Sequence, residues 1–100
     1  MSFKAAFIFI APEVDPKETV HEFVLPAISL TAVGVSNYAA AEKIAAELVD
    51  NGVTAIELCA GFGNDGVARI TKAVKGKATV GVVRFDNHPG FGFKSGDELF

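Results

Sequence analysis

Residues 61–66, Gly-Phe-Gly-Asn-Asp-Gly, have the composition and spacing of an anion-binding loop. They follow an apolar run that predicts a strand and precede a pattern that predicts a helix, which is the right context for G-x-G-x-x-G. Glycines let backbone N–H groups approach an anion, and the N-terminus of a helix adds partial positive charge. We therefore expect Gly61, Gly63, Asn64 and Gly66 to bind a small polar or anionic ligand. A purely structural tight turn is the alternative.

A dinucleotide fits this loop less well than a smaller ligand does. Asp86 follows the loop at about the 20-residue distance of a ribose-binding acid. However, the residues after position 85 show no pattern that would build the second half of a dinucleotide-binding sheet. Asp65, inside the loop, would also repel a pyrophosphate.

Glu57 is an acid in the middle of an expected central strand. A buried carboxylate without a partner is costly or becomes neutral, so Glu57 needs a partner or a function. One interpretation is a general acid or base, or an anchor for a ligand. The other is a structural ion pair, with Arg84 as the partner if the two strands present these side chains on one face.

Cys59 and His88 are a candidate nucleophile and its base. Cys59 lies where the strand meets the glycine loop, and a nearby helix N-terminus favours the thiolate. The alternative for Cys59 is a small packed side chain. His88 follows the next strand in a polar segment that adds Arg84 and Asp86 to the expected ligand contacts. A metal site is not predicted, because the acids and histidines of this region lack a metal-binding spacing.

Near-continuous apolar runs predict four strands, covered on both faces as in a parallel sheet. These runs are residues 3–10, 28–35, 54–59 and 78–85.

Capping patterns and 3.6-residue periodicity predict three helices between these strands. Residues 15–18 form a capping box for a short helix that ends before Pro26. The second helix is capped by Ser36 or Asn37 and runs to about Asp50. The third begins at residue 64 or 65 and runs to about residue 75.

This alternation predicts a single α/β domain, residues 1–100, with mainly parallel strands and right-handed crossovers. We favour a flavodoxin-like open sheet of order 2-1-3-4, because Ser29 and Thr31 make one face of the second strand less apolar, as at an edge. A (βα)4 half-barrel is the alternative. In both folds ligands bind at the carboxyl ends of the strands, where the candidate residues lie. Residues 86–100 lose periodicity and form a C-terminal arm.

Composition limits the partners and the location of the protein. The net charge is −3 and Lys and Arg are not clustered, so nucleic acid is not an expected partner. The apolar run near the N-terminus is too short to span a membrane, and the single cysteine indicates a reducing compartment, so we expect a cytoplasmic protein. Half of the residues are hydrophobic, and the arm has apolar side chains that need burial, which predicts a homodimer.

Three stretches resemble a family of small bacterial α/β proteins of unknown function. They are the N-terminal FKAAFIF, the central AIELCAGFG and the closing VGVVRFDNHPGFGFKSGDELF. The likeness covers nearly the whole chain. It implies a compact stand-alone domain, and it assigns no activity to any residue.

These observations favour a small-molecule site at the strand ends. If the protein is an enzyme, proton transfer of a lyase or isomerase type is more natural than redox chemistry, and the sequence names no cofactor. The alternative is a non-catalytic binding or assembly module that uses the phenylalanine-rich arm.

Overall fold

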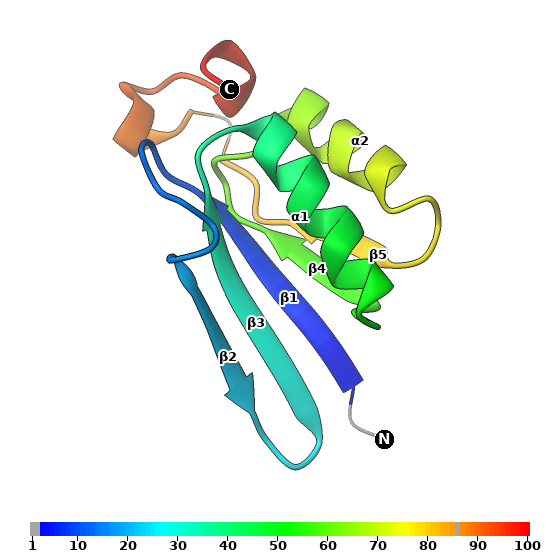
Figure 1. Ribbon diagram of the computed structural model, residues 1–100. Helices are drawn as coiled ribbons and strands as arrows, with labels where there is room; N and C mark the ends of the chain where they lie inside the picture. Colours follow the sequence, from blue (N-terminus) through cyan, green and yellow to red (C-terminus); the bar gives the residue numbers. More distant parts are fainter. Residues whose placement is uncertain (1–2, 86) are drawn as a thin grey trace.

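The computed structural model describes residues 3–85 and 87–100. Within these ranges five strands form one open sheet of order β2-β3-β1-β4-β5, against which two α-helices pack (Figure 1). Neither helix is long and apolar enough to cross a membrane. The elements are β1 Phe3–Ile10, β2 Val20–Val24, β3 Ile28–Val35, α1 Tyr38–Asp50, β4 Ala55–Leu58, α2 Asn64–Ala73, β5 Thr79–Val82 and the 3-10 turns η1 Pro89–Phe91 and η2 Gly96–Glu98.

The four expected parallel strands and their order are confirmed. β3, β1, β4 and β5 are parallel neighbours, which is the predicted order 2-1-3-4 in an open sheet rather than a half-barrel. α1 begins after the predicted cap, because Asn37 Oδ1 accepts a hydrogen bond from the Ala40 N–H at 2.8 Å. Gly52 follows α1 with a φ of 94°, the left-handed conformation that ends a helix.

The predicted helix after residue 15 is wrong, because this segment forms a turn and then a strand. The Asp15 carboxylate accepts a hydrogen bond from the Lys17 N–H at 2.9 Å, so the capping pattern closes a turn. From Val20 the sequence Val-His-Glu-Phe-Val alternates and is rich in β-branched and aromatic residues, which favours a strand.

β2 pairs antiparallel with β3, so β3 is an inner strand and not the expected edge. Ser29, one of the two polar residues of β3 that suggested an edge, has another role. The Ser29 hydroxyl donates to the Glu22 carboxylate of β2 at 3.0 Å and so joins the two strands.

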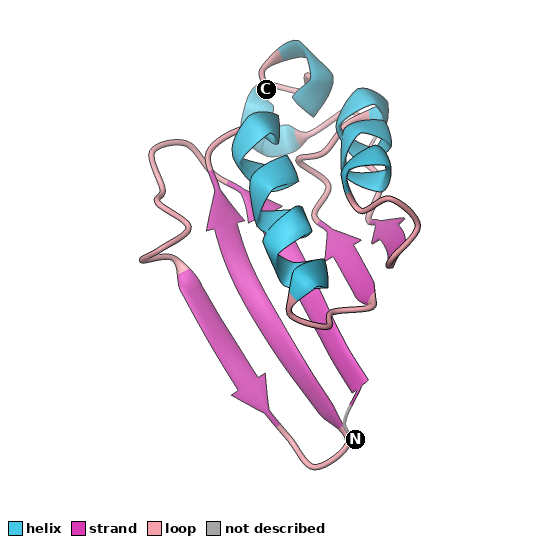
Figure 2. Cartoon of the chain, turned by 45° about the vertical axis from the view of Figure 1, so that its right-hand side comes forward, coloured by secondary structure: helices cyan, strands magenta, loops and turns pink. Residues whose placement is uncertain are grey.

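Both helices lie on the same side of the sheet (Figure 2). The connections β3–α1–β4 and β4–α2–β5 step across the sheet in the same direction, and right-handed crossovers therefore place both helices on one face. The connection from β1 to β3 steps the other way and would place a helix on the opposite face, but it contains β2. The expectation of a sheet covered on both faces is wrong, and we call the face without a helix the open face.

Side chains alternate between the two faces. Ala6, Ile8, Val33, Ile56 and Leu58 lie beneath the helices and are at most 2% exposed. The residues that alternate with them line the open face: Phe3, Ala5, Phe7 and Phe9 of β1, His21 and Phe23 of β2, Ile28, Leu30, Ala32 and Gly34 of β3, Ala55 and Glu57 of β4, and Thr79 and Gly81 of β5.

Candidate functional site

The C-terminal arm, followed from residue 87, places Asp97 at the N-terminus of α2. The Asp97 carboxylate accepts hydrogen bonds from the backbone N–H of Asp65 at 3.0 Å and of Gly66 at 3.2 Å. It also accepts from the Tyr38 hydroxyl at 2.8 Å. The helix dipole favours an acid at this position. The backbone donors that the sequence offered to an anionic ligand are thus used by a carboxylate of the same chain.

These donors stabilise the ionised form of Asp97. Desolvation raises the pKa of Asp97, but the Asp65 N–H, the Tyr38 hydroxyl and the N–H groups of Gly66 and Asn64 together lower it below 3.8. A carboxyl with a lowered pKa stabilises the fold while it is ionised. Its contribution is therefore present above about pH 4 and is lost as the pH falls through the pKa of the folded state.

Tyr38, the first residue of α1, connects the arm to the glycine loop. Its hydroxyl accepts a hydrogen bond from the Gly63 N–H at 3.0 Å while it donates to Asp97. Its ring is 2% exposed and stacks on Phe62, with ring centroids 5.6 Å apart. Burial, assisted by Asp97 and opposed by the Gly63 N–H, raises the pKa of Tyr38 from 10.0 to about 12.

Each glycine of the loop is required by a close contact. A Cβ on Gly61 would lie 2.2 Å from a side-chain carbon of β1. A Cβ on Gly63 would lie 2.3 Å from the Asp97 carboxyl carbon, and one on Gly66 would lie 2.5 Å from the Tyr38 ring. All three distances are too short for non-bonded carbon atoms. The packing of the arm and of α1 therefore accounts for the G-x-G-x-x-G spacing without a ligand.

Three of the predicted ligand-binding residues lie together at the glycine loop: Gly63, Asn64 and Arg84. The Arg84 guanidinium donates to the side-chain oxygen of Asn64. Both residues, with Gly63 and Ser95, line a cavity of about 50 Å³. This volume accommodates water molecules or a small ion, and it is far below the ~300 Å³ at which pockets for drug-sized ligands begin.

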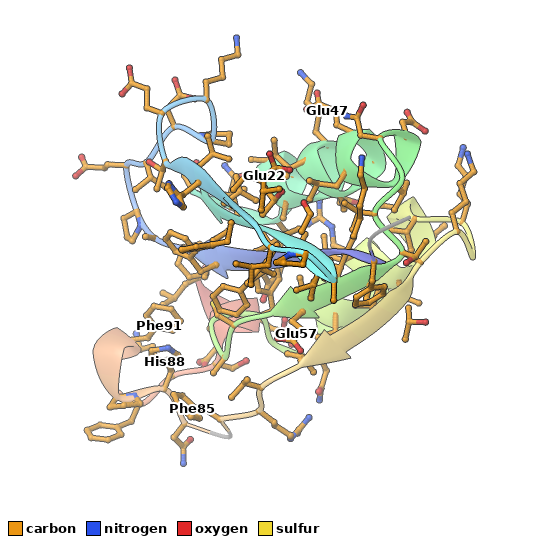
Figure 3. All side chains as sticks on the ribbon, turned by 90° about the horizontal axis from the view of Figure 1, so that it is seen from below. Glu22, Glu47, Glu57, Phe85, His88 and Phe91 are labelled. Atoms are coloured by element: carbon orange, nitrogen blue, oxygen red, sulfur yellow. The ribbon has the colours of Figure 1, made fainter. Side chains whose placement is uncertain are left out.

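Glu57 lies on the opposite side of the sheet from this cavity. It is exposed on the open face, level with Phe7 of β1 and Gly81 of β5. Figure 3 shows its side chain directed away from the helices. Arg84 instead contacts the start of α2 on the helix side, so the shared face on which a Glu57–Arg84 pair depended does not form.

Cys59 is held by backbone groups at the end of β4. Its sulfur accepts from the N–H of Ile10 at 3.4 Å and from the N–H of Gly61 at 3.3 Å. The thiol is free and partly buried. These contacts fix the sulfur against the turn of the glycine loop.

His88 belongs to an aromatic group in the arm. Its Nδ1 accepts from the Gly90 N–H at 3.0 Å, and its ring stacks on Phe91 with centroids 3.9 Å apart. Phe85 meets the same ring edge-on, with ring centroids 5.3 Å apart. Figure 3 labels the three residues in one region of the arm. Because Nδ1 is an acceptor, a neutral His88 carries its proton on Nε2. Asp86, the other predicted residue of this segment, lies outside the described residues.

Among the described residues, no group of three His, Cys, Asp or Glu side chains is placed so that it could hold a metal ion.

The sequence matches a protein-family model described as "Family of unknown function (DUF6506)" over residues 3–98. The chain belongs to this family. No curated protein and no solved structure matches it. Membership confirms the resemblance seen in the sequence and assigns no role to any residue.

Asp97 and Tyr38 are the two residues of this region that sequence analysis missed. The arm contains a signal for Asp97, because residues 95–98 read S-x-x-E. This pattern forms a capping box in which the Ser95 hydroxyl accepts from the Asp97 N–H and Glu98 accepts from the Ser95 N–H. The box folds η2, which presents Asp97 to α2. No local pattern indicates that Tyr38 is its second partner.

Tyr38 is the one tyrosine of the chain, so its ionisation can be followed directly by tyrosinate absorbance. We expect an apparent pKa of about 12 in the folded protein, read after a rapid pH jump. Because the fold favours the neutral phenol, its contribution to stability is full below about pH 10 and is lost as the pH rises through the folded value. Replacing Asp97 with Asn should lower the pKa of Tyr38. A folded-state titration at the ordinary value would contradict the hydrogen-bonded arrangement.

Gly63→Ala should lower the free energy of unfolding by roughly 2 kcal/mol or more, because the new Cβ displaces the Asp97 carboxylate and breaks its hydrogen bonds. Gly81→Ala is the matched control, since a Cβ there meets nothing within 4 Å. We expect a change of no more than about 0.5 kcal/mol for the control. Urea unfolding measures both, and equal effects would refute the steric requirement at Gly63.

Proposed function

We propose that this protein is a non-catalytic module that self-associates through the open face of its sheet. The observation that supports this is the exposure of aromatic side chains on that face. Phe3 and Phe23 are each 49% exposed, and Phe7 and Leu30 lie partly exposed on the same face. Continuous apolar patches of this kind mark interaction surfaces in proteins.

The polar candidates support a binding role better than a catalytic one. Glu57, Cys59 and His88 do not line the cavity beside the glycine loop. The proposal therefore assigns no reaction and no cofactor. The free thiol of Cys59 favours a reducing compartment, and we propose the cytoplasm on that basis.

The sheet, and not the arm, supplies the docking surface in this proposal. Phe91 and Phe100 of the arm pack against the core of their own chain. Their rings meet at a centroid distance of 5.3 Å. The arm thereby fills the carboxyl end of the sheet and leaves the open face to a partner.

Phe23→Lys should convert the wild-type dimer to a monomer, because it places a charge within the apolar contact. Val24→Lys is the matched control: Val24 is 73% exposed on the same strand, but its side chain points to the other face. We expect this variant to remain dimeric. Sedimentation equilibrium measures both masses, and a wild-type protein that is monomeric at all concentrations would refute the proposal.

The cavity lined by Gly63, Asn64, Arg84 and Ser95 supports a second candidate function, the binding of a small anion. The Arg84 guanidinium provides the positive charge, and the volume suits an ion better than a nucleotide. In this case the strand ends hold a small anionic ligand, as the sequence analysis predicted.

Phosphate or sulfate should raise the melting temperature of the wild-type protein in a saturable way, and Arg84→Gln should abolish the increase. Chloride at matched ionic strength is the control. Equal stabilisation of the wild type and the variant would show a general salt effect and would exclude this anion site.

A further inference from the structure

We infer that two copies pack open face to open face about a two-fold axis that runs along the strands, midway between β3 and β1, so that His21 of each copy pairs with Glu57 of the other. This inference rests on the proposed self-association and specifies its geometry. It follows from strand register, side-chain size and charge.

His21 and Glu57 lie in one row across the open face. The register places His21 opposite Ala32, Ala32 opposite Phe7, and Phe7 opposite Glu57. From β2 to β4 the row therefore consists of a histidine on β2, a small residue on β3, a large residue on β1 and an acid on β4. Within one chain His21 and Glu57 are three strand spacings, about 14 Å, apart, so they cannot contact each other.

A rotation of 180° about the proposed axis reverses this row. β2 then faces β4 of the second copy, and β3 faces β1. In the reversed row His21 meets the Glu57 carboxylate, and Phe7 meets the small Ala32. An imidazole N–H donates to a carboxylate whether or not the ring is charged, so each copy supplies both partners of an isologous contact.

The neighbouring row is complementary in the same way. Register places Phe23, Leu30, Ala5 and Ala55 side by side on β2, β3, β1 and β4. After the same rotation Phe23 faces Ala55, and Leu30 faces Ala5. Large side chains therefore meet small ones in both rows, which is the interdigitation that packed sheets about 10 Å apart require.

The charge on Glu57 selects this axis over the alternative. A face-to-face dimer buries the carboxylate, and a buried charge without a partner is strongly destabilising. Among the described strand residues of the open face, His21 is the group that can carry a positive charge. The alternative is a two-fold axis perpendicular to the strands, which places β4 against β4 of the second copy and β2 against β2. In that arrangement His21 and Glu57 do not meet.

Four strands overlap in this arrangement, because the axis between β3 and β1 leaves β5 without a facing strand. At about 4.8 Å between strands and about 3.3 Å per residue, they make a flat patch of roughly 400 Å² before side-chain relief is counted. Standard dimer interfaces bury ~800 Å² per partner. The flat patch therefore supplies about half of that area, and the relief of the phenylalanine side chains adds to it.

Two single variants, His21→Glu and Glu57→Lys, test the pairing. In the His21→Glu homodimer two carboxylates face each other, and in the Glu57→Lys homodimer His21 loses the carboxylate that accepts from it. At both symmetric positions the contact is lost, so the dissociation constant should rise about 10-fold or more. In an equimolar mixture of the two variants, the introduced carboxylate at position 21 of one chain meets the introduced ammonium at position 57 of the other. The second contact of the same heterodimer keeps the unaltered His21 against the unaltered Glu57. The mixture should therefore form a heterodimer close to wild-type affinity. Glu47→Lys, an equal charge change at an exposed position of α1, is the control and should have no effect.

The outcomes separate the inference from the proposed function. A monomeric wild type overturns both. If the wild type is a dimer and each single variant forms a homodimer of the same affinity, with no tighter heterodimer in the mixture, the pairing alone is overturned. A Glu57→Lys homodimer that is tighter than the wild-type dimer also overturns the pairing. Circular dichroism checks that the variants fold. If either does not, His21→Gln and Glu57→Gln replace them, and a double-mutant cycle without coupling overturns the inference.

Discussion

Parallel crossovers are right-handed, and this rule, applied to the connection between β1 and β3, determines which face of the sheet a helix could cover. Between β1 and β3 the chain steps away from β4, so a helix there would cover the face opposite α1 and α2. Residues 20–24 alternate and are rich in β-branched and aromatic side chains, which suits a strand rather than a helix. The segment extends the sheet at its edge instead. One layer of helices is therefore all that covers the described strands.

Much of this fold follows from local sequence. The apolar runs that form β1 and β3 have no competing helical period, and Asn37 is followed by an apolar stripe with a 3.6-residue period. The segment after Asp15 differs from the prediction because Asp15 closes a single turn and no helix follows it. Local caps indicate where a helix can begin, whereas the residues beyond the cap decide whether it continues.

The candidate site was less predictable because its decisive contact is long-range. The loop at residues 61–66 was correctly placed between a strand and a helix. Its backbone donors, however, are met by Asp97, which lies in a segment without periodicity. The face of Glu57 followed from alternation, but its exposure depended on the path of a connection far away in the sequence. The G-x-G-x-x-G spacing alone does not show whether its glycines make room for a ligand or for another segment of the same chain.

The connection between β1 and β3 also bears on how relatives of this chain would differ. A relative with a longer insertion at this position has room for a third helix, and handedness would direct that helix over the bare side of the sheet. Such a protein would be a three-layer sandwich, complete without a neighbour. If the proposed self-association holds, the length of this one segment would separate family members that need a second copy from those that do not.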